Sequence, residues 1–362
     1  MPLNYYDLVT AKTNNNKELL NECLKSNDFI EDKLNVIAVL SNYCNYKRRL
    51  NLFKEFVERM KKYENINLYI VELIYPNQEY KVTEKNNPMH LQLKSNSLLF
   101  HKENMINLGV QKLLPKNWKA MAWIDADIEF LNLNWVSDTL KALNKFDLVH
   151  LWNKCEFLDQ KNEVSDEFYS YGSKYCSGDY FKNGNGKGYS YWHPGFAWAC
   201  RREFYDLTNG LYDRGIIGSG DYIMTQLYLK RIANGDKTLE GFESDIKKYG
   251  IPLENYEVKI AYVNTTIKHF FHGQRANRKY VERNLILKEN CYDPIVHLRY
   301  DDNGVLEYTE DVSEKFKNDI RNYFLERNED EFYENNSEEG KESSSETKNN
   351  VGIFSCFKYL FK

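Results

Sequence analysis

The sequence predicts an α/β fold in which helices flank a mainly parallel sheet. Four short apolar runs, at residues 35–40, 67–73, 119–124 and 146–151, alternate with segments of helical periodicity. Strands separated by helices of this length pair in parallel, and helices cover both faces of their sheet. Hydrophobic residues make up 42% of the 362 residues, which is enough for one large domain or two small ones.

The first half of the chain supplies three strand–helix units. Ser41 and Asn42 end the first strand, and apolar residues at three- and four-residue spacing mark a helix over 50–60. After the second strand we expect a polar loop over 75–91 and a helix that carries the apolar residues of 105–114 and stops at Pro115. The third strand, 119–124, then runs directly into two aspartates.

The second half of the chain is less regular. Residues 153–192 are rich in Gly, Asn, Lys and Tyr, so they are interpreted as a long loop or lid. A further strand–helix unit is expected over 196–233, late strands over 262–271 and a late helix over 277–288.

The chain divides into four segments by composition. Residues 1–33 are interpreted as a polar N-terminal extension with some helix, and 34–325 as a single enzyme-sized domain. Residues 326–350 have almost no apolar side chains, which predicts a disordered acidic linker. The tail, 351–362, has an apolar stripe at helical spacing, so it would lie in a membrane interface, helped by acylation of Cys356, dock on a partner, or have no role.

Charge and cysteine usage exclude several classes of protein. Lys and Arg number 49 against 53 Asp and Glu, so a protein whose main role is to coat nucleic acid is not expected. The chain has no apolar run near 18 residues and no signal-peptide pattern. Its seven cysteines form no paired framework, so a reducing, cytoplasmic location is expected, with peripheral membrane contact through the tail as an option.

The first candidate site is the aspartate pair in Trp123-Ile-Asp-Ala-Asp127. It follows a buried strand, at the edge of a parallel sheet where ligands bind. On an extended chain Asp125 and Asp127 point to the same side, where their charges would repel without a cation. Mn²⁺ or Mg²⁺, holding a diphosphate, is the expected partner, and the alternative is a solvated turn.

The second candidate site combines Trp192-His-Pro-Gly-Phe196 with Gly218-Ser-Gly-Asp221. Glycines beside aromatic rings suit a surface where a sugar lies close to the backbone. Asp221 opens a helix, where the dipole favours its ionised form. It is therefore a candidate catalytic base, and the alternative is an ordinary helix cap.

The third candidate site is His269-Phe-Phe-His-Gly273, followed by Arg275. On an extended strand the two histidines face opposite sides, so they are not expected to share one metal, and His272 is the better placed ligand. Arg275, with the basic residues after it, would neutralise diphosphate oxygens. The alternative is a core histidine beside a solvated basic helix start.

These three segments, in this order, resemble glycosyltransferases of the GT-A fold over residues 34–290. The resemblance implies a Rossmann-like sheet, a metal held by Asp125, Asp127 and His272, and a nucleotide-sugar donor. The segment from Gly195 to Asp221 resembles inverting galactosyl- and N-acetylgalactosaminyltransferases, which implies that Asp221 is the base. This chain has Gly-Asp where an acidic pair is usual in that family.

The resemblance also implies where the donor would bind. The end of the first strand falls where such enzymes hold the nucleotide, which makes Ser41, Tyr43 and Arg48 candidate contacts. Lys94 and Asn96 are two more, and Asp125 and Arg275 complete the set of candidate cofactor-binding residues.

The sequence therefore predicts a metal-dependent hexosyltransferase that moves a sugar from a nucleotide-diphosphate donor, such as a UDP-sugar, to a hydroxyl acceptor with inversion. The acceptor would be a glycan, a glycoprotein or a small molecule. Two alternatives stay open at this point: an inactive nucleotide-sugar or carbohydrate-binding protein on the same scaffold, and a metal-dependent phosphohydrolase or nucleotidyltransferase.

Overall fold

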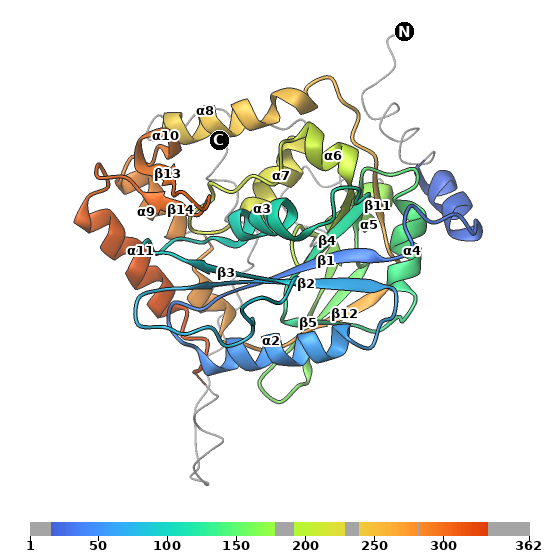
Figure 1. Cartoon of the computed structure of the whole chain (residues 1–362), viewed down its shortest axis with the longest axis horizontal. Helices are drawn as coiled ribbons and strands as arrows, with labels where there is room; N and C mark the ends of the chain where they lie inside the picture. The colour runs from blue at the N-terminus through green and yellow to red at the C-terminus, as the bar shows by residue number, and fades with distance from the viewer. Residues whose placement is uncertain (1–15, 178–191, 229–238, 281, 332–362) are drawn as a thin grey trace.

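A seven-stranded sheet runs through the centre of the molecule, with the strand order β11-β6-β10-β4-β1-β2-β3 (Figure 1). The computed structural model describes residues 16–177, 192–228, 239–280 and 282–331. The pairs β1–β2, β1–β4, β2–β3 and β6–β11 are parallel, and β10 is antiparallel to both of its neighbours. The strands are β1 (Leu34–Ser41), β2 (Ile66–Ile74), β3 (His90–Lys94), β4 (Ala120–Ile124), β6 (Leu148–His150), β10 (Ala197–Arg201) and β11 (Ile260–Tyr262).

Each face of this sheet has its own hydrophobic core, because side chains alternate along the strands. On β1, Ile37 belongs to one core, while Val36 and Ala38 belong to the other. Helix α3 (Lys102–Leu113) covers the first face, and α2 (Lys47–Met60) and α4 (Trp135–Ala142) supply apolar side chains to the second core (Figure 1). The first core also receives residues of α7 (Gly220–Tyr228), α8 (Glu240–Gly250), α9 (Glu282–Glu289) and α11 (Glu314–Glu326).

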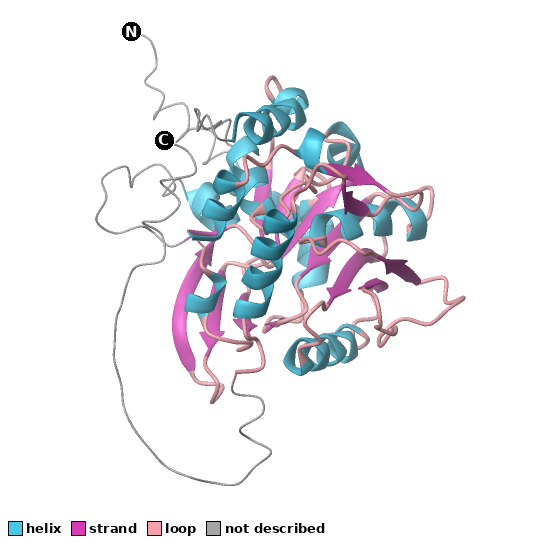
Figure 2. Cartoon of the chain, turned by 90° about the vertical axis from the view of Figure 1, so that its left-hand side faces the viewer, coloured by secondary structure: helices cyan, strands magenta, loops and turns pink. Residues whose placement is uncertain are grey.

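Two smaller sheets complete the architecture (Figure 2). The larger has the order β5-β12-β7-β8-β9, and the smaller pairs β13 with β14. Their strands are β5 (Ile128–Phe130), β7 (Lys154–Leu158), β8 (Val164–Ser170), β9 (Trp192–His193), β12 (Thr266–His269), β13 (Leu298–Tyr300) and β14 (Leu306–Tyr308). The remaining helices are α5 (Tyr171–Ser177), α6 (Arg202–Leu207), α10 (Pro294–His297) and the 3-10 turns Ile251–Leu253 and Arg275–Arg278.

The predicted fold class is confirmed: a mainly parallel sheet is flanked by helices in a single domain. One strand was missed and one prediction was wrong. The expected loop over 75–91 is present up to residue 89, and the strand β3, which starts at His90, was not predicted. The expected loop or lid over 153–192 contains the antiparallel pair β7–β8 and then α5, and residues 178–191 lie outside the described part. Strand β8 is largely exposed, so no apolar pattern marked it, and its pairing with β7 defines it.

The segments that flank the predicted domain are partly ordered. Residues 16–25 of the N-terminal extension, where some helix was expected, form a helix, and its Leu20 and Cys23 are buried in the same core as β1. Residues 327–331 of the predicted linker follow α11 as an ordered segment in which Glu329 is buried. The rest of the predicted linker and the whole predicted tail, 351–362, lie outside the described residues.

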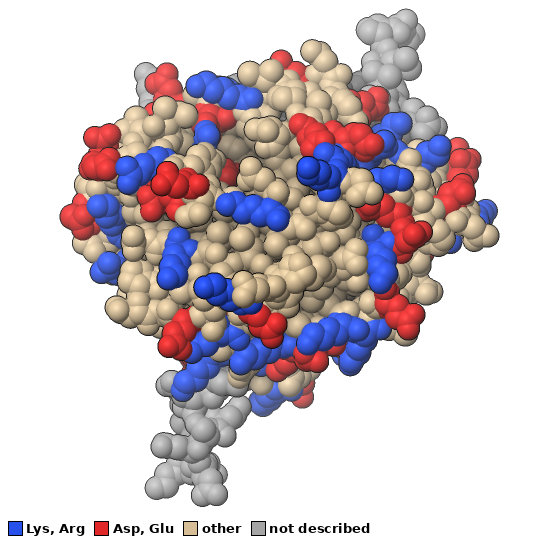
Figure 3. Space-filling view, in the orientation of Figure 1, with Lys and Arg blue, Asp and Glu red and all other residues tan. Residues whose placement is uncertain are grey.

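The surface of the described residues carries both signs of charge. Figure 3 shows Lys and Arg interspersed with Asp and Glu over the face seen there. Among the described helices, none has the length and apolar character that crossing a bilayer requires.

Candidate active site

A cavity of about 300 Å³ opens where β1 and β4 end at their carboxyl edge. It is lined by the loop between β1 and α2, the turn after β4, the segment before β10, the start of α7 and the residues that follow β12. The end of α11 and the segment after it close the wall. The cavity thus lies where parallel strands end, as in other open α/β sheets.

Three candidate metal ligands meet on one side of this cavity, which we call the histidine side: Asp127, His269 and His272. One ligand atom of each lies within 4.8 Å of the others. The turn after β4 brings Asp127 beside the end of β12, where the Phe270 N–H donates to the Asp127 carbonyl at 2.8 Å. That backbone bond holds the two histidine-bearing positions against the carboxylate.

The side-chain distances on the histidine side are short. Asp127 Oδ2 is 2.8 Å from His272 Nε2 and 3.6 Å from His269 Nε2. Asp127 Oδ1 and both ring nitrogens of His269 are buried without a hydrogen-bond partner. Burial lowers the pKa of His269 to about 3, so its imidazole is neutral at physiological pH. Burial by itself raises the pKa of Asp127, but His269, His272 and Arg278 lower it further than burial raises it.

His272 Nε2 has two close polar neighbours. The Arg278 guanidinium, which can only donate, hydrogen-bonds to this nitrogen, which then accepts. Asp127 Oδ2 lies 2.8 Å from the same nitrogen. A cation satisfies such a set of acceptors, and a carboxylate with two imidazoles suits Mn²⁺. The residues present fit a divalent metal ion.

The same cavity is lined by a second set of charged residues, which we call the lysine side. Lys102 Nζ, at the start of α3, is 2.6 Å from Asp125 Oδ1 and 3.4 Å from Asp221 Oδ2. Burial lowers the pKa of Lys102, and the carboxylates of Asp125 and Asp221 reverse this and hold it above its ordinary value. Burial raises the pKa of Asp125 to about 6, against the opposing effect of Lys102.

A further carboxyl, that of Glu103, lies near Lys102, Asp125 and Asp221 of the lysine side. Its side chain is only 2% exposed, and Oε2 has no hydrogen-bond partner. A Cβ at Gly220 would come within 2.5 Å of Glu103 Oε1, so the carboxyl fills the space that a side chain at position 220 would need. Burial raises the pKa of Glu103 to about 8, so it is protonated at neutral pH.

The predicted aspartate pair is split between the two sides. Asp125 pairs with Lys102, and the metal-ligand group found among the described residues does not include it. Residues 126 and 127 form a turn and not an extended strand, so period-two alternation does not apply to Asp125 and Asp127, although both line the cavity. The expectation that the two histidines do not share a metal differs from the structure, in which both lie close enough to Asp127 to hold one ion. Strand β12 ends at His269, so period-two alternation does not reach His272.

Some of the predicted base and donor contacts line the cavity, and others do not. Asp221 lines the cavity in the first turn of α7, and its Oδ1 is buried without a partner. Ser41 and Tyr43 line the cavity too; Ser41 Oγ is 2.9 Å from the Tyr75 hydroxyl, and the Tyr43 ring packs edge-on against Tyr75 at 5.3 Å. Arg275 lines it and stacks on Phe168 at 4.7 Å.

Three predicted donor contacts lie elsewhere. Arg48 donates from Nε to the Phe271 carbonyl at 2.9 Å and does not line the cavity, whereas its neighbour Arg49 does. Lys94 and Asn96 are exposed and do not line the cavity. Position after a strand indicated the right region, but the direction of each side chain depends on local turns.

Sequence reasoning missed Lys102, Arg49 and Glu329. A weak sequence signal could have pointed to Lys102 as a site residue. It begins, together with Glu103, a helix that is otherwise largely apolar. Glu329 had none, because it lies in a stretch that reads as a polar linker and is far along the chain from the histidine side.

Comparisons with known proteins give weak likenesses. No protein-family model matches the chain, and no curated protein matches its sequence. Among solved structures, a Drosophila β1,4-galactosyltransferase 7 variant in complex with manganese, UDP-Gal and xylobiose is 13% identical, with a TM-score of 0.37, over 80% of this chain and 98% of that one.

Two other solved structures are similar to the same degree. The mannosyltransferase PcManGT of Pyrobaculum calidifontis, in complex with GDP-Man and Mn²⁺, is 10% identical with a TM-score of 0.39, over 78% of this chain and 73% of that one. S. aureus TarS 1–349 is 11% identical with a TM-score of 0.37, over 84% of this chain and 74% of that one. These likenesses are too weak to carry an argument, so the residues of the site must carry it.

Proposed function

We propose that this protein is a metal-dependent glycosyltransferase that transfers a sugar from a nucleotide-diphosphate donor, such as a UDP-sugar, to a hydroxyl acceptor with inversion. One observation carries the proposal. Asp127, His269 and His272, whose ligand atoms lie close enough together to hold a metal ion, lie beside the same cavity as the unpartnered carboxylate oxygen of Asp221. Such a cavity has a place for a metal-bound diphosphate and a place for a base.

Asp127, His269 and His272 would hold the ion, Mn²⁺ or Mg²⁺. When bound, the ion supplies Lewis-acid stabilisation of the negative charge that develops on the departing diphosphate. Arg275 and Arg278 line the same part of the cavity and would add charge-assisted hydrogen bonds to phosphate oxygens.

Asp221 would act as the base. As the acceptor oxygen forms its bond to the anomeric carbon, the hydroxyl proton passes to the Asp221 carboxylate, and the electrons of the breaking sugar–phosphate bond pass to the diphosphate. Lys102, 3.4 Å from Asp221 Oδ2, stabilises the ionised carboxylate that this step requires. A single displacement of this kind inverts the anomeric centre.

The nucleotide would lie along the end of β1. Tyr43 offers a ring face at the cavity wall, and Ser41 offers a hydroxyl. Asp125 would accept a hydrogen bond from a ribose or sugar hydroxyl while Lys102 balances its charge. The acceptor would be a hydroxyl group on a glycan, a glycoprotein or a small molecule.

The test is hydrolysis of, and transfer from, a panel of UDP- and GDP-sugars in the presence of Mn²⁺. We expect release of the nucleoside diphosphate from at least one donor and loss of release with EDTA. Thermal stabilisation by UDP and Mn²⁺ without turnover of any donor would instead indicate a binding protein. Release of pyrophosphate from a nucleoside triphosphate would indicate a nucleotidyltransferase.

A further inference from the structure

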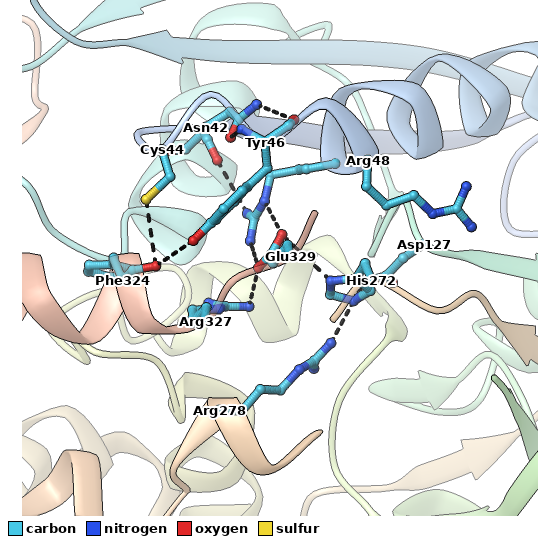
Figure 4. Close-up of polar contacts among 12 residues, drawn as sticks. Asn42, Cys44, Tyr46, Arg48, Asp127, His272, Arg278, Phe324, Arg327 and Glu329 are labelled. Carbon is cyan, nitrogen blue, oxygen red and sulfur yellow. Dashed lines mark hydrogen bonds and ion pairs between the residues drawn. The ribbon is translucent and has the colours of Figure 1, made fainter. Parts of the chain in front are cut away.

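The segment Arg327–Glu331, which we call the C-terminal clasp, runs from the end of α11 to the histidine side. Figure 4 shows Glu329 of this segment beside His272, with Arg327 and the β1–α2 loop around it. The Glu329 side chain is 2% exposed. A buried carboxylate is costly unless it is paired, so its partners indicate what holds it there.

Two arginines hold the Glu329 carboxylate in place. Arg49 donates from Nε to Oε2 at 2.8 Å and from Nη2 to Oε1, and Arg327 Nη2 is 2.9 Å from Oε1. The pair with Arg49 is bidentate, which fixes the orientation of the carboxylate as well as its position. The carboxylate is therefore paired with two guanidinium groups and fixed in place.

The fixed carboxylate faces the second nitrogen of a proposed metal ligand. Glu329 Oε2 is 3.6 Å from His272 Nδ1, on the side of the ring opposite to Asp127 (Figure 4). This distance exceeds that of an ordinary hydrogen bond, but an ionised carboxylate at this range favours a proton on the nitrogen that faces it. Arg278, by donating to Nε2, requires the same tautomer. Both neighbours therefore favour the proton on Nδ1 and an unprotonated, acceptor Nε2.

We propose that Glu329 is a positioning residue that holds His272 in the Nδ1–H tautomer, with Nε2 directed at the metal site. The inference rests on the proposed function, because it assumes that the histidine side binds a divalent ion. Carboxylates that accept from the outer nitrogen of a metal-binding histidine fix its ring and tautomer, and their loss lowers metal affinity by about 10–100-fold. Metal affinity in this protein would then depend on the C-terminal end of the domain.

The clasp has a second anchor that does not touch His272. The Asp330 carboxylate accepts from the Lys47 and Arg48 backbone N–H groups at the start of α2, both at 2.8 Å. The Tyr46 hydroxyl accepts from the Asn328 N–H at 3.1 Å. Asp330 therefore provides a matched control: its loss loosens the same segment but leaves the Glu329–His272 contact intact.

The experiment measures Mn²⁺ affinity by calorimetry on the full chain without any donor. It compares wild type with Glu329→Gln, Asp330→Asn and Asp127→Asn. We expect about 10–100-fold weaker binding for Glu329→Gln, wild-type affinity with a lower Tm for Asp330→Asn, and no binding for Asp127→Asn. Where Glu329→Gln does not fold, Glu329→Asp replaces it, because it keeps the charge that the arginines need and withdraws the oxygens by one methylene.

A second measurement reads the tautomer directly in the metal-free protein. Long-range ¹H–¹⁵N spectra of the seven histidines, with His272 assigned from a His272→Gln variant, should show Nδ1–H in wild type. A purely structural role of Glu329 would not change this tautomer. In Glu329→Gln we expect a shift toward Nε2–H, because Asp127 then becomes the stronger acceptor.

The outcomes separate the inference from the function on which it rests. Wild-type Mn²⁺ affinity and an unchanged His272 tautomer in a folded Glu329 variant, with binding lost in Asp127→Asn, overturn the positioning role and leave the metal site standing. Equal weakening by Asp330→Asn also overturns it, since a general loosening of the clasp would then suffice. No Mn²⁺ binding by the wild type overturns the metal site and the inference together.

Discussion

The two sides of the cavity carry partly buried carboxylates, but they balance the negative charge in different ways. On the lysine side, Lys102 lies within 3.4 Å of oxygens from Asp125 and Asp221, so a cation of the chain is already in place. On the histidine side, Asp127 faces two imidazoles that present acceptor atoms, and Asp127 Oδ1 has no partner.

This difference suggests different roles for two aspartates that are two residues apart. A carboxylate with a permanent lysine partner suits steps in which charge must stay balanced as a proton moves. A carboxylate beside two imidazoles that could bind a metal suits an ion that arrives with the substrate. The four predictions that follow each remove one element of this contrast.

The largest effect should come from Asp127→Asn. The amide cannot supply the anionic ligand, so Mn²⁺ binding and donor turnover should both be lost, at a cost of several kcal/mol of transition-state stabilisation. Calorimetry with Mn²⁺ and a donor hydrolysis assay measure the two losses. The control is Asp302→Asn at an exposed position. Unchanged Mn²⁺ affinity in Asp127→Asn would contradict the metal site.

Asp221→Asn should affect the rate of transfer without affecting metal binding. Removing the base should lower the rate of transfer about 10²–10⁴-fold, while Mn²⁺ affinity stays at the wild-type value because Asp221 is not among the metal-ligand group. Steady-state kinetics on the best donor, with calorimetry in parallel, measures both. A rate within a factor of two of wild type would rule out Asp221 as the base.

Lys102→Met should leave the lysine side with an uncompensated pair of partly buried carboxylates. Leaving such charged groups without their partner costs about 1–3 kcal/mol of stability, which we expect at pH 8. The pKa of Asp125, about 6 in the wild type, should rise further without the lysine, so the loss should be smaller at pH 5 where the carboxyl is protonated. Urea unfolding at both pH values measures this.

The control for this variant is Lys112→Met, an exposed lysine at the end of the same helix. A loss in Lys102→Met that is independent of pH would show that the lysine contributes by packing alone. Equal losses in the two variants would contradict a buried ion pair on the lysine side.

The smallest effect should come from Glu103→Gln. The pKa of Glu103 is about 8 in the folded protein against an ordinary value of 4.5, so the native state binds the extra proton between these values. Wild-type stability should therefore fall as pH rises through this window, by at most about 1.4 kcal/mol per pH unit, and glutamine should remove this part of the slope. Unfolding at pH 6, 7 and 8 tests it, with the exposed Glu240→Gln as control. Parallel slopes in wild type and Glu103→Gln would contradict a protonated Glu103.

The parts of the site that could be predicted are those with a local signal. Asp127 follows a buried strand, and His272 follows a short strand near a glycine, so pattern and position marked both residues. Arg48 and Asn96 were predicted from position alone, and the structure directs Arg48 at the Phe271 carbonyl and leaves Asn96 at the surface. Position along a strand indicates which edge of the sheet a residue reaches, whereas side-chain direction depends on the turn that follows.

The sequence by itself determined the α/β class, the parallel strands and the edge of the sheet where Asp125 and Asp127 lie, because hydrophobic periodicity is a local property. Only the tertiary structure decided that these aspartates have different partners, that His269 joins His272, and that Glu329 stands behind the metal site. Those contacts join residues up to 280 positions apart, as in the pair of Arg49 and Glu329. No short-range pattern records such a contact, because packing of the whole domain creates it.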